Sequence, residues 1–266
     1  MTTALKQIID VLDKLYPPAL AEDYDNVGLH FGSQHAEVSK VLVSLDIRPK
    51  VVQEAIDKQV DTIIVHHPPI FKPIKRFDID NPQINMYSQL IQNQINIFAL
   101  HTNLDKATNG MNDWLAETLQ LSHVVALATD PNPDNHIGRI GALQQPMPRA
   151  EVLAYIKKAL DIERLTVIEK KPKTTYQTIA VVGGSGSEFA EAAALQEADI
   201  YLTGDITYHH GHDCYEYDMM TVDVGHYAEK IFIAKMAALL GQLNLEHQWS
   251  IDIIASKENT NPFQYL

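Results

Sequence analysis

Short apolar segments alternate with amphipathic segments along the chain, and this alternation is typical of α/β proteins. Apolar residues recur at helical spacing from Leu5 to Leu15, and Thr2 or Thr3 is available to cap that helix. By contrast, Thr62 to Val65 is a continuous β-branched run, typical of a strand buried on both faces. In the first half, the pattern predicts helix 5–15, strand 41–47, a helix beginning at Pro49, strand 62–65, helix 83–94, strand 95–100 and helix 111–119.

The second half repeats this alternation after a polar break at Asp130–Asp134, where proline alternates with Asp and Asn, and the break is predicted to be a linker. The elements predicted beyond it are strand 137–143, helix 149–160, strand 164–168, strand 179–182, a glycine-rich turn 183–186, helix 187–198, strand 199–202, strand 219–224 and helix 226–240. The predicted fold is α/β. Two similar lobes, 1–130 and 131–266, would each hold a mixed, mostly parallel sheet flanked by helices.

Composition and charge narrow the functional classes. The 266 residues are 45% hydrophobic, enough to fill the core of one large or two medium domains. A net charge of −13 argues against nonspecific binding to nucleic acids or anionic membranes. No apolar run approaches the roughly 18 residues that cross a bilayer, and the first residues lack the pattern of a signal peptide. A cytoplasmic protein without a membrane partner is therefore expected.

The cysteine content restricts any metal chemistry. Cys214 is the only cysteine, so an intrachain disulfide is excluded and a metal site must use nitrogen and oxygen ligands. Mixed histidine and carboxylate ligands favour zinc, iron or manganese.

Two histidines stand at the end of the 62–65 strand. His66 and His67 are followed by Pro68 and Pro69, which cannot donate to a ladder and therefore end the strand. In α/β sheets, ligands bind at the carboxyl ends of parallel strands. Because neighbouring strand residues point to opposite faces, the two rings suit two nearby metal ions better than one. Taken alone, the pair is equally compatible with two surface histidines in a loop.

Two other segments bring similar side chains to strand ends. The strand before His101 also leads to Asp105, and the last predicted strand is followed by His226 and Glu229, three residues apart on one helix face. His101 would be a sixth ligand or a hydrogen-bond partner of a ligand. Together these segments match a dinuclear site that binds two divalent metal ions and supports metal-assisted hydrolysis. The predicted metal ligands are His66, His67, Asp105, His226 and Glu229.

Further polar residues near strand ends are candidates for contact with a substrate. Each has a simpler explanation, because acidic loops commonly satisfy turns, glycines commonly form tight turns, and histidines clustered in a loop at 209–212 would be solvated surface. The glycines of 183–186 would bind a phosphate through their amides, although the segment lacks the P-loop spacing. The candidates for substrate contact are Asp25, Asn26, Gly184, Ser185 and Asp205, and the candidates for proton relay are His101 and His209.

The order of these motifs resembles the NIF-three-like dinuclear metal centre family, often labelled GTP cyclohydrolase 1 type 2 homologue. The resemblance covers nearly the whole chain, and it implies a two-lobed α/β subunit of the short form, without an inserted domain. It also implies two metals near the lobe junction, closed by helix 226–240, and a homohexameric toroid, and it places the five predicted ligands at the family's ligand positions. The motifs are DYDNVGL at 23–29, VHHPP at 65–69, HTNLD at 101–105, Gly204-Asp205 with Tyr208-His209, DVGHYAE at 223–229 and NTNPF at 259–263.

Two functions of different classes are compatible with these features. The first is a metal-dependent hydrolase that acts on a nucleotide or a related phosphorylated small molecule. The alternative is a non-catalytic ring that handles metal or binds other proteins. Sequence-specific DNA binding has little support, since the chain shows no basic recognition helix.

Overall fold

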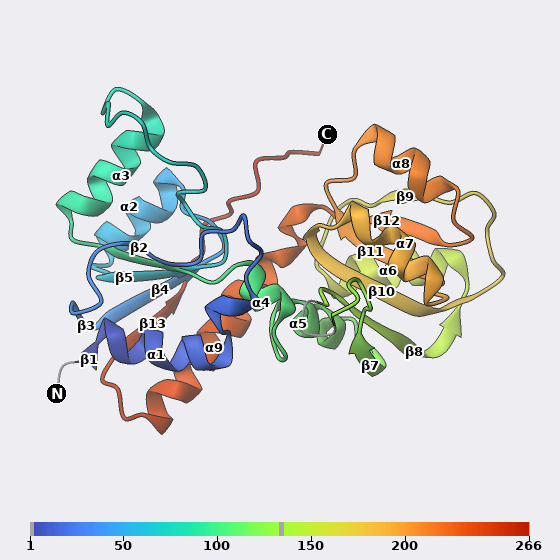
Figure 1. The fold of residues 1–266 in the computed structure, drawn as a ribbon, viewed down its shortest axis with the longest axis horizontal. Coiled ribbons are helices and arrows are strands. Elements are labelled where there is room, and N and C mark those ends of the chain that lie inside the picture. Colours follow the sequence, from blue (N-terminus) through green and yellow to red (C-terminus); the bar gives the residue numbers. More distant parts are fainter. Residues whose placement is uncertain (1–2, 133–135, 266) are drawn as a thin grey trace. The chain divides into compact units, whose positions relative to one another are not determined.

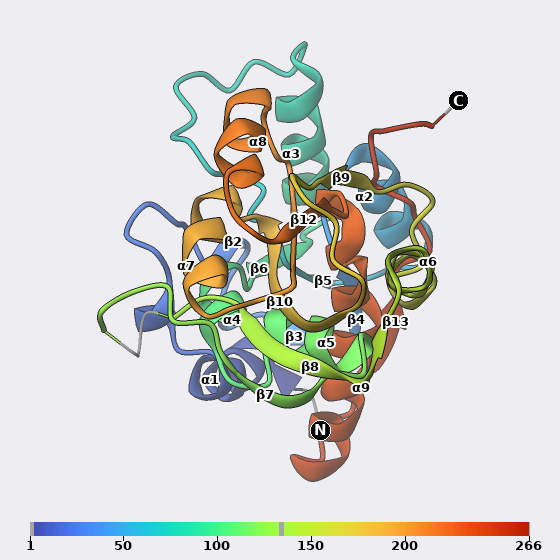
Figure 2. The ribbon, with the colours of Figure 1, turned by 90° about the vertical axis from the view of Figure 1, so that its right-hand side faces the viewer.

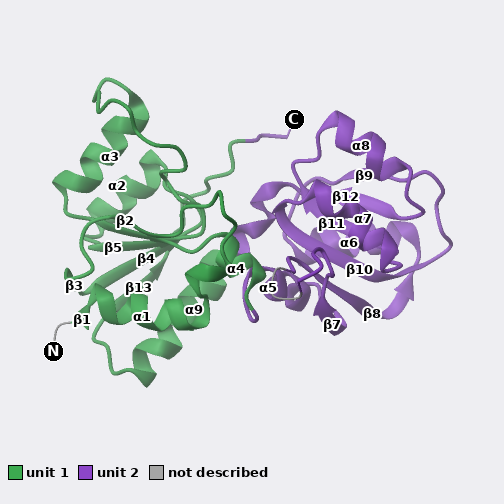
Figure 3. Ribbon diagram, in the orientation of Figure 1, with its two compact units in different colours: residues 1–107, 232–262 green, residues 108–231, 263–266 purple. Residues whose placement is uncertain are grey.

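The computed structural model describes residues 3–132 and 136–265 (Figure 1). The chain divides into two compact units, each with its own sheet and helices (Figure 3). Among the described residues, no helix is both long enough and apolar enough to cross a membrane. Unit 1 contains Met1–Ala107 and Phe232–Pro262, and unit 2 contains Thr108–Ile231 and Phe263–Leu266.

Unit 1 is built on a five-stranded sheet. Its strands are β2 (Gly28–Phe31), β4 (Lys40–Ser44), β5 (Thr62–Val65), β6 (Asn96–Ala99) and β13 (Asp252–Ala255). The strand order is β13-β4-β5-β6-β2, and every neighbouring pair is parallel except β6 with β2. All residues of β5 and β6 are buried, which explains why their sequences do not alternate between apolar and polar.

Helices cover both faces of this sheet. They are α1 (Leu5–Leu15), α2 (Pro49–Asp57), α3 (Pro82–Gln92), α4 (Thr102–Lys106) and α9 (Ile231–Glu246), with a 3-10 turn η1 (Pro18–Leu20). In Figures 1 and 2, α2 and α3 lie on one side of the sheet and α1 and α9 on the other. A two-stranded ribbon of β1 (Thr3–Ala4) and β3 (Glu37–Val38) lies beside them.

Unit 2 is built on a six-stranded mixed sheet. Its strands are β7 (Ser122–Ala126), β8 (Arg139–Met147), β9 (Thr166–Ile168), β10 (Tyr176–Ser185), β11 (Ile200–Gly204) and β12 (Met220–Asp223). The order is β7-β8-β10-β11-β12-β9. Strands β10, β11 and β12 are parallel to one another, and the other neighbouring pairs are antiparallel. The predicted α/β fold is confirmed, with mostly parallel pairing in unit 1 and mixed pairing in unit 2.

The α-helices of unit 2 have between 6 and 11 residues. They are α5 (Met111–Thr118), α6 (Arg149–Ala159), α7 (Ala190–Leu195) and α8 (Tyr208–Tyr215), with 3-10 segments η3 (Ser187–Phe189) and η4 (His226–Lys230). Side chains from α7 and α8 join those of β10 and β11 in one buried apolar cluster. This cluster contains Tyr201 and the single cysteine, Cys214.

Several predicted elements differ from the structure. Strands β7 and β13 were not predicted. Strand β7 is largely exposed, so its sequence contains no buried apolar run, and β13 is a four-residue strand at a sheet edge. The predicted turn at 183–186 is wrong, because β10 continues to Ser185. The histidine cluster lies on helix α8 and not in a loop. The N-cap of α1 is Ala4, whose amide donates to Gln7 Oε1, and not a threonine; Thr2 lies outside the described residues.

The two units also differ from the predicted lobes 1–130 and 131–266. Strand β13 pairs with β4 in the sheet of unit 1, so the chain beyond Phe232 belongs with the first part of the sequence. The predicted linker at 130–134 falls within unit 2, between β7 and β8, and its last two residues lie outside the described residues. A boundary read along the chain misses this division because unit 1 is discontinuous.

Asp199 ties the start of β11 to β10. Its Oδ2 accepts hydrogen bonds from the amides of Gln177 and Thr178, at 2.8 and 2.9 Å, and its Oδ1 lies 3.0 Å from Lys173 Nζ. Burial raises the pKa of this carboxyl, but the hydrogen bonds from the two amides and from Lys173 lower it more. The pKa of Asp199 in the folded protein therefore lies below its ordinary value.

Replacing Asp199 with asparagine is expected to lower the free energy of unfolding by about 1–3 kcal/mol at pH 7. Since the folded pKa is depressed, the ionised carboxylate stabilises the fold above its unfolded pKa of about 3.9, and this stabilisation is lost as the pH falls through the folded pKa. Urea unfolding at several pH values should show the difference between wild type and variant shrinking below about pH 4. The exposed Asp218→Asn serves as control, and a loss that does not change with pH would contradict the explanation.

Candidate metal centre

The carboxyl ends of three neighbouring strands of unit 1 bring polar side chains to one edge of the sheet. Asp46 follows the end of β4, His66 and His67 follow β5, and His101 follows β6. Strands β4, β5 and β6 are parallel and adjacent, so their carboxyl ends are neighbours. The sequence-based expectation that the 62–65 and 95–100 segments deliver histidines to the same edge is confirmed.

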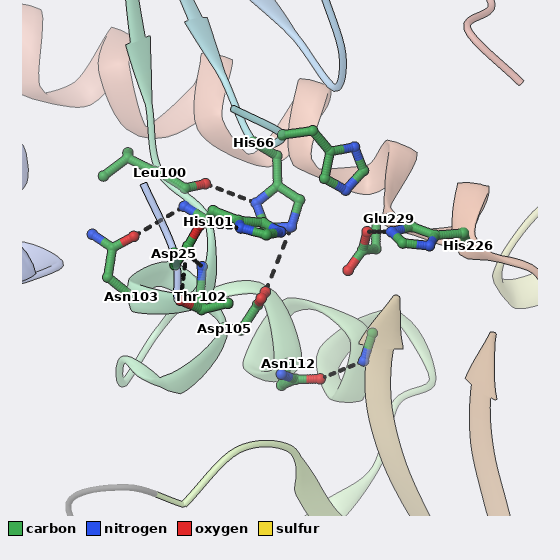
Figure 4. Close-up of polar contacts among 12 residues, drawn as sticks. Asp25, His66, Leu100, His101, Thr102, Asn103, Asp105, Asn112, His226 and Glu229 are labelled. Atoms are coloured by element: carbon green, nitrogen blue, oxygen red, sulfur yellow. Dashed lines mark hydrogen bonds and ion pairs between the residues drawn. The ribbon is translucent and has the colours of Figure 1, made fainter. Parts of the chain in front are cut away.

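His66 is fully buried, and a hydrogen bond at Nδ1 fixes the orientation of its ring (Figure 4). Its Nδ1 lies 2.8 Å from the backbone oxygen of Leu100, and its Nε2 lies 3.6 Å from Oδ1 of Asp105 on α4. A carbonyl oxygen only accepts hydrogen bonds, so Nδ1 donates, and Nε2 is the ring nitrogen that faces Asp105. The ring of Phe232 lies against that of His66, with 5.5 Å between centroids.

His67 is oriented by a carboxylate. Its Nδ1 donates to Oδ1 of Asp46 at 2.8 Å, and the other oxygen of Asp46 accepts from the hydroxyl of Thr260. Burial raises the pKa of the Asp46 carboxyl, but the hydrogen bonds from His67 and Thr260 lower it more, and the resulting pKa lies below its ordinary value. Asp46 is therefore a negatively charged acceptor that fixes the tautomer of His67.

His101 is oriented in the same way by Asp25 (Figure 4). Its Nδ1 donates to Oδ1 of Asp25 at 2.8 Å, while the amide and hydroxyl of Thr102 donate to Oδ2. Burial raises the pKa of the Asp25 carboxyl, but the hydrogen bonds from His101 and Thr102 lower it well below its usual range. The side chain of Asp25 is buried against these partners, so the contacts it makes orient His101.

The three histidines of unit 1 form a group that could hold a metal ion. One ring nitrogen from each of His66, His67 and His101 lies within 4.8 Å of the other two. The ring centroids are separated by 4.8 to 5.6 Å. Because each Nδ1 donates to an oxygen, each ring presents Nε2 as its basic nitrogen, which is the arrangement by which proteins prepare histidine ligands for a metal.

In unit 2, His226 and Glu229 lie on η4. Side chains three residues apart eclipse on a 3-10 helix, and Nε2 of His226 lies 3.3 Å from Oε2 of Glu229 (Figure 4). The Nδ1 of His226 donates to Oδ2 of Asp205 at 2.7 Å, so Asp205 orients this ring as Asp46 and Asp25 orient theirs. Glu229 is only 2% exposed. The predicted common face of His226 and Glu229 is present, on a tighter helix than the predicted one.

The glycines at 183 and 184 leave room for Glu229. A Cβ built on Gly183 would lie 2.8 Å from Oε1 of Glu229, and one on Gly184 would lie 3.0 Å from the same atom and 3.2 Å from Nε2 of His226. The amide of Gly183 donates to Oδ1 of Asn112 at 2.9 Å. Close approach of the carboxylate therefore explains the glycine-rich sequence in β10, where a turn was expected.

The other candidate residues lie in less specific surroundings. The side-chain amide of Asn26 donates to the backbone oxygen of Ile70 at 2.9 Å, and Ser185 is exposed at the end of β10. His209 is exposed on α8, where its ring contacts that of Tyr208. In the described part of the chain, no hydrogen bond, ion pair or ring contact joins His209 to His226 or Glu229.

Sequence reasoning missed three residues that support the predicted ligands. They are Asp46, Thr260 and Asn112. Asp46 was not recognised as a residue at a strand end, because strand 41–47 was expected to include it, whereas β4 ends at Ser44. The same rule that located His66 would have located Asp46, since both follow neighbouring parallel strands. Thr260 and Asn112 come from distant segments, and although Thr260 lies in the NTNPF motif, neither sequence indicates which residue it contacts.

Comparisons with known proteins agree with this architecture. The sequence matches the family profile described as Duf34/NIF3 (NGG1p interacting factor 3) over residues 3–262. A Streptococcus pneumoniae protein named GTP cyclohydrolase 1 type 2 homolog is 38% identical over 263 residues, which cover 98% of each chain. The crystal structure of a Bacillus cereus protein related to NIF3 has a TM-score of 0.93 and 26% identity, and the match covers 100% of this chain and 99% of that one.

One of the relatives is longer than this chain. A Bacillus subtilis protein, also named GTP cyclohydrolase 1 type 2 homolog, is 26% identical with 98% of both chains covered. That alignment runs over 367 positions, more than the 266 residues of this chain, so the relative contains additional residues, as the resemblance to the short form implied. A profile match from residue 3 to residue 262 and a relative at 38% identity show that this chain belongs to the Duf34/NIF3 family.

Proposed function

We propose that this chain binds two divalent metal ions through His66, His67, Asp105, His226 and Glu229. The observation that carries the proposal is that the Nδ1 atoms of all three histidines donate to oxygens, which leaves Nε2 as the ligand nitrogen. The two carboxylates are buried, and a buried carboxylate is costly without a compensating cation. This set of nitrogen and oxygen ligands favours zinc, iron or manganese.

We further propose that the metal centre hydrolyses a nucleotide or a related phosphorylated small molecule. Divalent ions supply polarisation of a phosphoryl or carbonyl oxygen and lower the pKa of bound water. Asp25 orients His101, and His101 lies beside His66 and His67, so His101 is the better placed of the two proposed proton relays. The names of the relatives, which include the words GTP cyclohydrolase, support a nucleotide-related reaction without establishing it.

Elemental analysis and a turnover assay test both parts of this proposal. The purified protein is expected to contain two metal ions per chain and to turn over GTP or a member of a phosphoester panel with Zn²⁺, Mn²⁺ or Fe²⁺. The His67→Ala variant should lose both metal and turnover. Turnover that survives in this variant would remove the metal centre from the reaction. Two bound ions without turnover of any compound would favour the non-catalytic ring that handles metal or binds proteins.

Replacing Asp46 with asparagine is expected to weaken metal binding by about 10–100-fold. Asparagine cannot supply the charged acceptor that holds the Nδ1 proton of His67, so the ring is less basic at Nε2 and less restricted in orientation. Competition with a chromophoric chelator measures the affinity directly and needs no substrate.

A matched control for this variant is Asp57→Asn on α2. Asp57 is exposed and, among the described residues, accepts a hydrogen bond from Gln53 alone, so removal of its charge tests whether net charge alone changes the metal affinity. Equal affinities for wild type and Asp46→Asn would show that His67 does not depend on this carboxylate.

We also propose that the chain forms a homohexamer, the assembly that the resemblance of its motifs implies. Light scattering of the purified protein is expected to give six times the mass of one chain. A mass equal to that of a single chain would contradict the ring and leave the metal proposal unaffected.

A further inference from the structure

The segment Phe71–Asp80, called here the 71–80 loop, joins β5 to α3 and has no partner in either sheet. Every one of its ten residues is exposed, and it extends beside α3 in both Figures 1 and 2. Large apolar side chains face solvent along it, and an exposed apolar cluster of this kind usually marks a binding surface. These side chains are Phe71, Ile74, Phe77 and Ile79, which are 50%, 39%, 52% and 58% exposed.

Cations interleave with these apolar residues. Lys72, Lys75 and Arg76 follow Phe71 closely, and none of the three forms an ion pair with a carboxylate of the described residues. The acidic residue nearest to them in sequence, Asp78, accepts a hydrogen bond from the amide of Asp80. In a chain with a net charge of −13, three unpaired cations within five residues form a local site for a negatively charged ligand.

An aromatic pair lies at the start of the loop. Tyr24 and Phe71 are 67% and 50% exposed, and their ring centroids are 6.3 Å apart. The loop that carries Tyr24 is held directly after this residue, because Asn26 donates to the backbone oxygen of Ile70 and Asp25 accepts from His101. Tyr24 thus directly precedes the partner of His101, and Phe71 follows His67 closely along the chain.

The loop also encloses space. A hollow of about 460 Å³ is lined by residues from Pro69 to Arg76, by the first turns of α3 and by Tyr87. Tyr87 donates to the backbone oxygen of Pro69, so the back of the hollow is anchored to the end of the histidine segment. A hollow of this size is in the range of small-molecule sites.

We propose that the 71–80 loop is a binding site for a mononucleotide. Aromatic faces stack on the bases of nucleic acids, and Lys and Arg bind phosphate, so this combination fits a ligand with a flat ring and several negative charges. Along the chain, Phe71 lies between His67 and the cations, and the ring of Tyr24 is the neighbour of Phe71. The base is therefore directed toward the histidines, and the phosphates extend along the loop. This inference rests on the proposed hydrolase for the reaction, whereas the binding itself needs no metal.

Binding of guanosine, GMP, GTP and inorganic triphosphate to metal-free protein tests the inference. Affinity is expected to rise from guanosine to GMP to GTP, because each phosphate adds contacts with the cations. The triple variant Lys72→Ala/Lys75→Ala/Arg76→Ala should lower the affinity for GTP by about tenfold or more while leaving that for guanosine unchanged. The Tyr24→Ala variant should lower the affinity for guanosine and GTP alike, by about fivefold or more. All four side chains are exposed, so these variants should fold.

A matched control removes the same charge elsewhere. Lys157, Lys158 and Lys171 are exposed in unit 2, and their replacement by alanine should leave GTP binding unchanged. An equal loss of GTP affinity in this control would show that the net charge of the protein, and not the loop site, determines GTP binding. Inorganic triphosphate that binds as tightly as GTP would overturn recognition of the ring. Loop variants that change only the mass of the assembly would show that a second copy of the chain covers the loop.

The outcomes also separate this inference from the proposed hydrolase. If the triple variant turns over GTP like wild type and no binding to the loop is measurable, the loop site is refuted and the proposed hydrolase is unaffected. GTP binding that depends on Tyr24 and the cations, in a protein that hydrolyses no compound, would support the loop site and refute the hydrolase.

Discussion

A Glu229→Gln variant is expected to lose the increase in thermal stability that zinc or manganese gives the wild-type protein. A ligand that binds only the native state raises the free energy of unfolding by about 2.7 kcal/mol at 100 times its Kd. Glutamine has the size of glutamate but lacks the charge that a metal ligand supplies. The bound metal should fall from two ions to one or none, and differential scanning calorimetry with and without metal should show little shift in Tm.

The same variant makes a second, opposite prediction for the metal-free protein. Glu229 is 2% exposed, and a neutral amide removes the cost of burying an ionised carboxylate. The metal-free variant should therefore unfold at the same temperature as metal-free wild type or at a higher one. Glu246→Gln, at the exposed end of α9, is the control and should keep the full response to metal. A wild-type response in Glu229→Gln would remove Glu229 from the ligands.

Replacing Phe232 with alanine is expected to cause a loss of stability of about 3–5 kcal/mol. The ring is fully buried on α9, and its removal leaves a cavity in unit 1 that the surrounding side chains fill only partly. Because this ring lies against His66, the variant should also bind metal more weakly than wild type. Urea unfolding measures the first effect, and titration with metal at a temperature where the variant is folded measures the second.

Leu245→Ala provides the control on the same helix. Leu245 is 80% exposed, so its truncation should change the free energy of unfolding by no more than about 0.5 kcal/mol. A similar effect of both substitutions would show that the helix, and not the packing of Phe232 behind His66, determines the loss.

The fold was predictable where one face or both faces of an element are buried. Strand 62–65 and helix 5–15 were predicted with their observed bounds, because burial of both strand faces and of one helix face leaves a clear apolar pattern. Strands β7 and β13 were not predictable in this way. Each lies at a sheet edge with several exposed positions, so its identity depends on the partner strand more than on its own sequence.

The site was predictable for a related reason. His66, His67 and His101 follow buried parallel strands, and the rule that such strands end at one edge is enough to bring them together. The contacts around these rings were harder to predict from the sequence. Glu229 explains the glycines of β10 only through a close approach in space, and Thr260 reaches Asp46 from the far end of the sequence. Contacts of this kind are set by tertiary structure and leave no local pattern.

The discontinuity of unit 1 affects how the protein is made. Strand β13 and helix α9 are synthesised after all but a few residues of unit 2, so β4 lacks its edge partner while unit 2 is being synthesised. At ~5–20 residues per second this takes on the order of ten seconds. Throughout this interval the backbone groups of β4 that later pair with β13 remain open to other chains, as in any uncovered edge strand. Rapid folding of unit 2 does not shorten this exposure, because only the arrival of residues 252–255 at the ribosome exit ends it.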